Sequence, residues 1–453
     1  MSDEFDLVVI GAGPGGYVGA LRGAQLGLRT AVVERAAVGG RCLNQACIPA
    51  KATLRAADVL DGIRGASAHG IEVGEPTVDF AGVAARRDSV ISTLTGGVAG
   101  LLSRHRVEVI EGEARLQPRA VVVGDRVLAS RAVLVATGSR PLGLPGVDFG
   151  GRVIGTEEAW SFDRLPDTLA VVGAGPSGVE VASAYARLGS AVMLIEVADQ
   201  ILPGEDPDVI KPLVRGLRAD GVEILTGAGI EAVEATDTDV AFSVGGESRS
   251  ADWMVLATGR GADLEPLGLD QLGVERDGRG LIVVDGEGRT SVPGISAAGD
   301  VVAGPALAHK ASEEAIVAVE AIAGEPTVPV DHTNLPRVTF ASPALASVGL
   351  SETEARAAGL DPTIGRVPFS AVGAGTVLGD RSGLIKIVAG ADGEILGAHI
   401  VGSRAAELLQ QLVDTRALQG GVGDLARIVH SHPTLSEAVG EAARAADGWL
   451  IHG

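Results

Sequence analysis

Residues 5–34 read FDLVVIGAGPGGYVGALRGAQLGLRTAVVE, and residues 167–196 read DTLAVVGAGPSGVEVASAYARLGSAVMLIE. Each segment contains an apolar run, a glycine-rich turn, a stretch of small residues with helical spacing, and a second apolar run that ends in Glu. The interval from the first glycine to that acid is the same in both, Gly11 to Glu34 and Gly173 to Glu196. Such matched strand–turn–helix–strand units predict a duplicated nucleotide-binding fold.

The two turns follow the pattern GxGxxG, with Gly11, Gly13 and Gly16 in the first and Gly173, Gly175 and Gly178 in the second. Glycine permits a tight turn and lets a pyrophosphate approach the backbone at a helix N-terminus, where N–H groups favour an anion. Glu34 and Glu196 could each accept a hydrogen bond from a ribose, and Glu196 would disfavour a 2′-phosphate. We therefore predict a dinucleotide at each turn, with NAD preferred over NADP at the second. A tight turn without a ligand is the alternative.

The rest of the chain suggests further units. The runs AVLVATGSRP (132–141) and WMVLATGRGA (253–262) are alike and predict a closing strand for each nucleotide-binding unit. Apolar spacing predicts helices over 49–64, 83–104 and 305–323. The proline-rich stretch 324–336 is typical of a linker, and 337–453 mixes strand and helix patterns. A length of 453 residues suggests about three domains.

Composition excludes several classes of protein. A net charge of −21 and only 3% aromatic residues oppose binding to nucleic acid or to an anionic membrane. No uncharged run reaches the ~18 apolar residues of a spanning helix, and the N-terminus lacks the basic start of a signal peptide. We expect a cytoplasmic protein, whose acidity reflects either a saline habitat or solubility. Two cysteines are too few for a secreted disulfide scaffold.

The only cysteines, Cys42 and Cys47, lie in GRCLNQACIPAK at 40–51. At this spacing a disulfide requires a break in the helix between them. Pro49 suits a first helical turn, which places Cys47 at a helix N-terminus where the dipole stabilises a thiolate. The pattern favours a redox-active dithiol over two buried structural cysteines. Lys51 is a further candidate rather than an ordinary surface lysine, because the chain has only four lysines.

The segment HSHPTLSEAVGE at 430–441 supplies a candidate general base. His432 is followed by Glu437, and a carboxylate commonly orients a histidine that works near neutral pH. Thr434 to Glu437 is also a capping-box pattern for the next helix, and the two roles are compatible. We expect His430 to be structural. The sequence has no cysteine–histidine spacing typical of a metal site, so we predict no metal.

In their order along the chain, these motifs resemble those of the flavoprotein disulfide reductases, especially the members that oxidise dihydrolipoamide. The likeness also rests on GGRCLNQACIPAK (39–51), LVATGSRP (134–141), SAAGD (296–300), LAHKASEEA (307–315), FASPALASVGLSE (340–352) and ILGAHIVG (395–402). The resemblance implies an α/β fold with two Rossmann-like domains, for FAD and NAD, and an α+β C-terminal dimerisation domain. The implied boundaries are an FAD-binding segment at 1–148, an NAD-binding domain at 149–268, a return of the FAD domain at 269–331 and a dimerisation domain at 332–453.

The resemblance also implies residue roles. Cys42 would exchange with the dithiol substrate, and Cys47 would face the flavin. Lys51 would pair with Glu180 near the flavin. His432, oriented by Glu437, would act as the base in the partner subunit's active site. Further FAD contacts would come from Gly11, Gly13, Gly16, Glu34, Lys51, Gly112, Thr137, Gly138, Ser139, Gly299, Asp300, Ala308 and His309. NAD contacts would come from Gly173, Gly175, Gly178, Glu180, Glu196, Val233 and Gly259.

The implied reaction is oxidation of dihydrolipoamide by NAD⁺ through FAD and a Cys42–Cys47 disulfide. The implied assembly is a homodimer that serves a lipoyl protein of a 2-oxoacid dehydrogenase or glycine cleavage complex. Two alternatives stay open: an NAD(P)H-dependent reductase of glutathione or mycothiol disulfide, and a chiefly structural subunit of such a complex. The chain departs from the family pattern at Ala46, where the family has Gly, and at GRGAD (259–263), where it has GRRPN.

Overall fold

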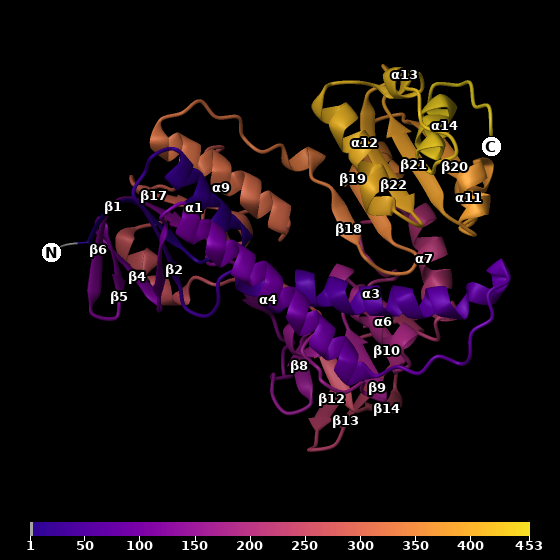
Figure 1. Ribbon diagram of the computed structural model, residues 1–453, viewed down its shortest axis with the longest axis horizontal. Helices are drawn as coiled ribbons and strands as arrows, with labels where there is room; N and C mark the ends of the chain where they lie inside the picture. Colours follow the sequence, from indigo (N-terminus) through magenta and orange to yellow (C-terminus); the bar gives the residue numbers. More distant parts are fainter. Residues whose placement is uncertain (1–2) are drawn as a thin grey trace.

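The computed structural model describes residues 3–453 and has three parts (Figure 1). The first part, at the left of the figure, contains a sheet ordered β3-β2-β1-β6-β5-β4, with β17 added beside β6. Its strands are β1 (Asp3–Ile10), β2 (Thr30–Glu34), β3 (Glu108–Glu111), β4 (Ala114–Gln117), β5 (Ala120–Val123), β6 (Arg126–Val135) and β17 (Ile295–Ala297). Strands β1, β2, β3, β6 and β17 pair in parallel. Because β17 comes from late in the chain, this part is discontinuous in sequence.

The second part, at the bottom of Figure 1, has an all-parallel sheet ordered β11-β10-β9-β15-β8. Its strands are β8 (Val153–Gly155), β9 (Thr168–Val172), β10 (Ala191–Glu196), β11 (Glu223–Thr226) and β15 (Trp253–Leu256). A separate antiparallel sheet contains β12 (Ile230–Ala235), β13 (Val240–Val244) and β14 (Glu247–Ala251). Where the chain passes between the two parts, β7 (Ser139–Pro141) pairs with β16 (Arg260–Ala262). The predicted duplication of a parallel α/β unit is confirmed.

The helices that follow the glycine-rich turns begin at proline. They are α1 (Pro14–Gln25) and α6 (Pro176–Leu188), and proline suits a first helical position because no N–H is needed there. Helix α1 packs against α9 (Ala308–Ala323). Helices α3 (Cys47–Arg64) and α4 (Phe80–Arg104) pack together across the middle of the molecule, and α3 also packs on α6 (Figure 1). The three predicted helices are confirmed, although α4 begins earlier than residue 83 and α9 later than residue 305.

The third part, at the upper right of Figure 1, is an antiparallel sheet covered by helices. The strand order is β18-β19-β22-β21-β20, from β18 (Arg337–Thr339), β19 (Leu345–Gly349), β20 (Thr363–Pro368), β21 (Leu384–Ala389) and β22 (Ile395–Val401). Helix α12 (Ala405–Ala417) packs on β19 and β22, and α14 (Ser436–Ala446) packs on β20 and β21. A Cβ atom at Gly365 would lie 2.0 Å from the Ala442 carbonyl oxygen, so glycine permits this close packing.

The predicted boundaries at 148, 268 and 331 fall between the sheets of these parts, and the division itself stays a prediction. Within residues 3–453, no helix combines the length and the apolar character that crossing a bilayer would require.

A buried lysine joins the second part to the third. Lys386 in β21 has only 3% of its side chain exposed, and its Nζ lies 2.9 Å from Asp206 Oδ2. Asp208 and Glu352 lie at 3.0 and 2.7 Å from the same nitrogen. Asp206 is also the N-cap of α7 (Pro207–Ala219). Burial alone would lower the pKa of Lys386, but the hydrogen bonds to these three carboxylates raise it. The lysine is therefore held charged at this junction.

Lys386→Met should lower the free energy of unfolding by about 3–5 kcal/mol, because Asp206 would stay buried without its counter-ion. Lys211→Met is the control. Lys211 is 69% exposed and lies 3.6 Å from Asp208, so its loss should cost less than about 1 kcal/mol. Urea unfolding followed by circular dichroism measures both variants. Wild-type stability in Lys386→Met would contradict this account of the junction.

Candidate active site

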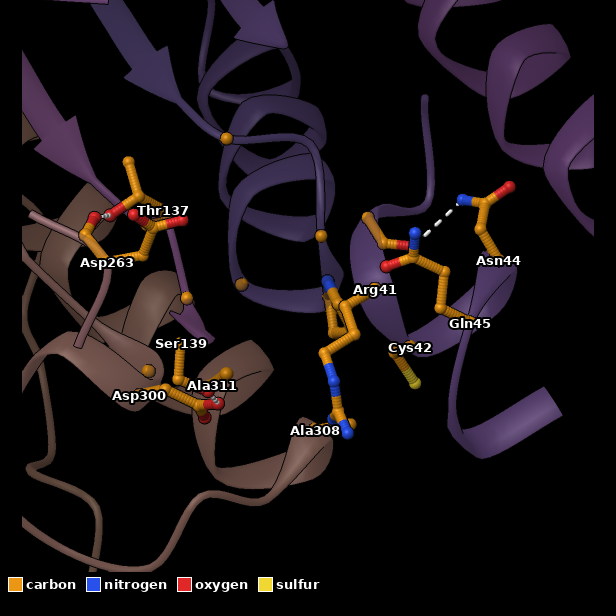
Figure 2. A pocket seen from close by; sticks show the side chains of 18 of the residues that line it. Arg41, Cys42, Asn44, Gln45, Thr137, Ser139, Asp263, Asp300, Ala308 and Ala311 are labelled. Atoms are coloured by element: carbon orange, nitrogen blue, oxygen red, sulfur yellow. Dashed lines mark hydrogen bonds between the residues drawn. The ribbon is translucent and has the colours of Figure 1, made fainter. Parts of the chain in front are cut away.

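A cavity of about 380 Å³ lies beside the first glycine-rich turn. In Figure 2, Thr137, Ser139 and Asp300 lie on one side of it, and Arg41 and Cys42 lie on the other. The lining includes nine of the residues predicted to contact FAD: Gly11, Gly13, Glu34, Thr137, Gly138, Ser139, Gly299, Asp300 and Ala308. Gly112 lines a smaller cavity that shares Gly11, Glu34 and Thr137 with the first.

The two glycine-rich turns have matched backbone geometry. Gly11 and Gly173 both have φ +98°, a conformation that favours glycine. A Cβ atom at Gly16 would lie 1.7 Å from the Gly11 carbonyl oxygen, and one at Gly178 would lie 1.9 Å from the Gly173 carbonyl oxygen. By contrast, a Cβ atom at Gly13 would meet its nearest neighbour at 3.9 Å. The backbone is thus tight where the strand meets the helix and open where a pyrophosphate would approach.

The acid at the end of the second strand is fixed in the same way in both units. Glu34 accepts hydrogen bonds from the N–H groups of Ala12, at 2.7 Å, and Ala36, at 2.9 Å. In the second unit, Glu196 accepts the corresponding hydrogen bonds from the N–H groups of Ala174, at 2.7 Å, and Ala198, at 2.9 Å. A carboxylate oxygen can accept more than one hydrogen bond, so each acid retains capacity for the predicted ribose contact.

The cysteine segment folds as two helices with a break between them. Cys42 lies in α2 (Gly40–Asn44), and α3 begins at Cys47. Between them Ala46 has φ −134°, a negative value that does not require glycine, so the departure at this position is compatible with the turn. The predicted helix break and the position of Cys47 at a helix N-terminus are confirmed. Both cysteines are free thiols and line the cavity.

The two thiols differ in acidity. The hydrogen bond from Cys42 lowers the pKa of Cys47 to about 7, and the positive charges of Lys51 and Arg41 assist against the effect of burial. The same hydrogen bond raises the pKa of Cys42, as do burial and the charge on Cys47. The dipole of α3 favours a thiolate at its first residue. The reduced pair therefore holds its thiolate on Cys47 near neutral pH.

Lys51 on α3 contacts side chains from the second and third parts of the molecule. Its Nζ lies 3.0 and 2.9 Å from the two carboxylate oxygens of Glu180 on α6. It also lies 4.5 Å from the ring centroid of Phe340, which follows β18, a distance typical of a cation–π contact. Glu180 Oε1 accepts a further hydrogen bond from the Phe340 N–H at 2.9 Å. The structure thus brings Lys51 and Glu180 together. The structure also places Phe340 beside Lys51, a contact that the sequence around the lysine does not predict.

A charged network connects Ser139 and Asp300 on one side of the cavity with Arg41 on the other, and the sequence did not predict its members Arg41, Glu157 and Arg260. Ser139 Oγ donates a hydrogen bond to Asp300, and Arg260 Nε donates to Ser139 Oγ at 2.8 Å. Arg260 and Arg41 both pair with Glu157. Burial opposes the charged form of Glu157, but the two arginines lower its pKa to about 2. The GRGAD segment therefore contributes Asp263 to the lining of the first cavity, while its Arg260 contacts the lining residues Ser139 and Glu157.

His432 and Glu437 contact each other, but away from the cysteines. His432 Nδ1 lies 2.9 Å from Glu437 Oε1, and the histidine side chain is 75% exposed. Both line a cavity of about 390 Å³ in the third part, together with His430 and Glu441. Among the described residues this cavity shares no lining residue with the one at the cysteines, and α14 lies far from α1 in Figure 1. Within a single folded chain, His432 does not reach the cysteine pair.

The segment before α14 differs from the predicted capping box. Thr434 Oγ1 donates to the Ser431 carbonyl oxygen and does not cap the helix, which begins after Leu435. Only the acidic half of the pattern forms, because Glu437 Oε2 accepts from the Thr434 N–H at 2.8 Å. Burial would raise the pKa of Glu437, but the bonds from Thr434 and His432 lower it. Glu437 is therefore an anchored anion beside the imidazole.

Four other predicted placements can be described. His430 Nε2 lies 3.1 Å from Gln411 Oε1, which suits the structural role expected of it. His309 Nε2 lies 3.0 Å from the Pro336 carbonyl oxygen, and Ala308 rather than His309 lines the first cavity. Val233 lies in β12 and packs against an apolar cluster of the second part. Gly259 follows β15 and has φ +128°.

The acidity of the cysteine pair can be measured. In the reduced protein, the rate of alkylation of Cys47 by iodoacetamide should rise with pH around a midpoint of about 7, because only the thiolate reacts. Lys51→Met should raise this midpoint by removing a positive charge, and Lys211→Met, which removes an exposed lysine, should leave it unchanged. Mass spectrometry of the labelled peptides identifies the cysteine. A wild-type midpoint near the ordinary thiol value of about 8.5 would show that the pair does not act in this way.

Known proteins are similar to this chain in sequence and in fold. Residues 5–315 match the family described as pyridine nucleotide-disulphide oxidoreductase, and residues 335–443 match its dimerisation domain. The dihydrolipoyl dehydrogenase of Bacillus subtilis (strain 168) is 41% identical over 99% of this chain and 98% of that protein. The dihydrolipoyl dehydrogenase of Geobacillus stearothermophilus is 40% identical over 99% of this chain and 97% of that protein.

Solved structures have a similar fold. LpdA from Mycobacterium tuberculosis has a TM-score of 0.89 at 26% identity, covering 97% of this chain and 99% of that chain. The flavoprotein disulfide reductase RclA from Escherichia coli has a TM-score of 0.87 at 26% identity, covering 96% and 98%. These matches confirm the predicted resemblance, the fold class and the cofactors FAD and NAD. The protein is an oxidoreductase, and the chain belongs to the pyridine nucleotide-disulphide oxidoreductase family, which it shares with the dihydrolipoyl dehydrogenases.

Proposed function

We propose that the protein oxidises dihydrolipoamide to lipoamide and reduces NAD⁺ to NADH, with release of one proton. The observation that carries the proposal is the Cys42–Cys47 pair in the wall of the cavity that begins at the first glycine-rich turn. Oxidation of a dithiol by a dinucleotide requires an exchangeable protein dithiol next to a two-electron carrier. Several relatives that match this chain along nearly their whole length are named dihydrolipoyl dehydrogenase, which supports dihydrolipoamide as the substrate.

The residues around the first cavity fit FAD. The open backbone at Gly13 and the N-terminus of α1 would hold the pyrophosphate. Asp300 would accept hydrogen bonds from the ribityl hydroxyls, and Glu34 from the adenosine ribose. When bound, FAD supplies the two-electron carrier between the dithiol and the nicotinamide. The cysteines and Lys51 would lie at the flavin end, opposite the adenosine end at Glu34 and Gly112.

The second glycine-rich turn would hold NAD. Gly173, Gly175 and Gly178 form the turn at the N-terminus of α6, and Glu196 stands at the end of β10. The residues after it, Val197 to Asp199, supply a second acid and no arginine. A 2′-phosphate would meet negative charge here, so we infer a preference for NAD⁺ over NADP⁺.

The chain's own residues supply the thiol chemistry. In the oxidised protein Cys42 and Cys47 would share a disulfide. A substrate thiolate attacks Cys42 Sγ, the bond between the two cysteines breaks, and Cys47 leaves as a thiolate, which its low pKa favours. The second substrate thiol then attacks the substrate sulfur joined to Cys42. Lipoamide forms, Cys42 takes a proton, and the pair has gained the two electrons that pass on to NAD⁺.

His432 would remove the proton from the first substrate thiol, and Glu437 would orient its imidazole. We infer that it does so in a partner subunit of a homodimer. Three features support this arrangement: the match to a dimerisation domain, the exposure of His432, and the separation of its cavity from the cysteines. Nearby Val429 is 94% exposed, which is compatible with an interface surface.

We infer that the lipoyl group is carried by a protein of a 2-oxoacid dehydrogenase or glycine cleavage complex in the cytoplasm, where thiols stay reduced. The relatives do not favour reduction of glutathione or mycothiol disulfide, or a chiefly structural role.

A substrate panel tests the reaction. The purified protein should form NADH from dihydrolipoamide and NAD⁺, much less NADPH from NADP⁺, and it should not oxidise NADH with glutathione disulfide or mycothiol disulfide. Cys47→Ser should abolish NADH formation and the long-wavelength absorbance of a thiolate next to flavin, because the thiolate is lost. Retention of either property in Cys47→Ser, or a glutathione or mycothiol disulfide as the best substrate, would reject the proposed function.

Mixed dimers test the shared site. His432→Gln alone should lower kcat by about 10²–10⁴-fold. If each site uses cysteines from one chain and His432 from the other, dimers formed from Cys47→Ser and His432→Gln chains have one intact site. An equal mixture should then recover about a quarter of wild-type activity after random exchange. Cys42→Ser with Cys47→Ser is the matched control, because no intact site can form. No recovery in the first mixture would exclude the shared site.

A further inference from the structure

Lys310 is a fully buried lysine that the proposed reaction does not use. It lies on α9, and 0% of its side chain is exposed. An ammonium group is expensive to remove from water unless it is paired and hydrogen-bonded. The partners of such a group therefore indicate which part of the structure it holds.

Lys310 contacts the backbone of Gly299 both directly and through Glu314. Lys310 Nζ donates a hydrogen bond to the Gly299 carbonyl oxygen at 2.9 Å and lies 3.1 Å from Glu314 Oε2. The same oxygen of Glu314 accepts a hydrogen bond from the Gly299 N–H at 2.9 Å. An ion pair on one helix thus holds both backbone polar groups of a single residue.

Gly299 occupies a constrained position at the first cavity. Its φ is +84°, and a Cβ atom there would lie 3.0 Å from the Ala311 Cβ. The next residue, Asp300, lines the cavity and accepts a hydrogen bond from Ser139. The peptide bonds on either side of Gly299 set the direction in which Asp300 leaves the backbone. Fixing Gly299 therefore fixes how Asp300 is presented to the cavity.

Glu314 also contacts a histidine through its second carboxylate oxygen. Its second oxygen, Oε1, lies 2.8 Å from His332 Nε2, and His332 is partly exposed. Glu314 and His332 line a separate cavity of about 250 Å³, while neither Lys310 nor Glu314 lines the first cavity. The ion pair therefore lies behind the dinucleotide cavity, where it would act on FAD only through Gly299 and Asp300.

We propose that Lys310 and Glu314 are positioning residues for FAD, which clamp Gly299 from both sides and so present Asp300 to the cofactor. This inference rests on the proposed role of the first cavity in FAD binding. The pair touches neither the cofactor nor the reacting atoms. Its expected effect is on how long the protein retains FAD.

The test compares FAD release from two holoenzyme variants. Lys310→Met should release FAD about tenfold faster than wild type or more, because Gly299 loses a charged donor and Asp300 loses its fixed direction. Lys386→Met is the matched control: it also removes a buried lysine paired with carboxylates, but in the third part of the molecule. It should release FAD at the wild-type rate. The amount of flavin passing an ultrafiltration membrane over time after dilution gives the rate.

A double variant separates positioning from general loss of stability. Lys310→Met/Glu314→Gln removes both charges, so neither ion is buried alone, and its melting temperature should lie nearer to wild type than that of Lys310→Met. FAD release should nevertheless stay fast, because the Gly299 carbonyl still lacks its charged donor. If Lys310→Met does not fold, the double variant alone is compared with Lys386→Met.

Two results would overturn the proposal: equal FAD release from the Lys310 and Lys386 variants, or wild-type release from the double variant. A wild-type protein that retains no FAD would instead reject the proposed function of the cavity, and this inference with it.

Discussion

The ion pair between Lys51 and Glu180 fixes the relation between the two nucleotide-binding units. Lys51 stands on the helix that begins at Cys47, and Glu180 stands on the helix that follows the second glycine-rich turn. Because Glu180 is only 7% exposed, the pair is weakly screened by solvent. The ring of Phe340 brings the third part against the same ammonium group. In the proposed reaction electrons pass from the thiols to the second dinucleotide, so a contact that aligns these helices also aligns the two ends of the electron path.

The two buried lysines, Lys310 and Lys386, hold similar junctions. Lys386 joins the second part to the third through Asp206 and Asp208, and Lys310 fixes the return of the chain to the first part at Gly299. Only Lys211 among the four lysines is largely exposed. An ammonium group is a compact charge that can face several oxygens from different directions, which suits places where separate elements converge. Two of the four lysines, Lys310 and Lys386, are such buried cations.

The sequence predicts well what depends on neighbouring residues. Both glycine-rich turns, the helix break between the cysteines and the position of Cys47 follow from local steric rules, and the structure has them. It predicts poorly the contacts that depend on how distant elements meet. Phe340 beside Lys51 and Glu157 between two arginines have no local pattern, since their partners lie far along the chain. The predicted capping box is wrong for a related reason: the Thr434 hydroxyl donates to a backbone carbonyl outside the helix.

The two cavities divide the proposed chemistry between chains. The acidity of Cys47 arises from groups of its own chain: the Cys42 thiol, Lys51 and the N-terminus of α3. The thiolate is therefore available in each folded subunit without His432. In the proposed mechanism, removal of the substrate proton depends instead on His432, which lies in another cavity of the same chain and would therefore act from a partner subunit. Under this proposal, electron transfer takes place within one subunit, whereas proton transfer requires the dimer. Dissociation of the dimer would stop turnover while leaving the reduced cysteine pair chemically unchanged.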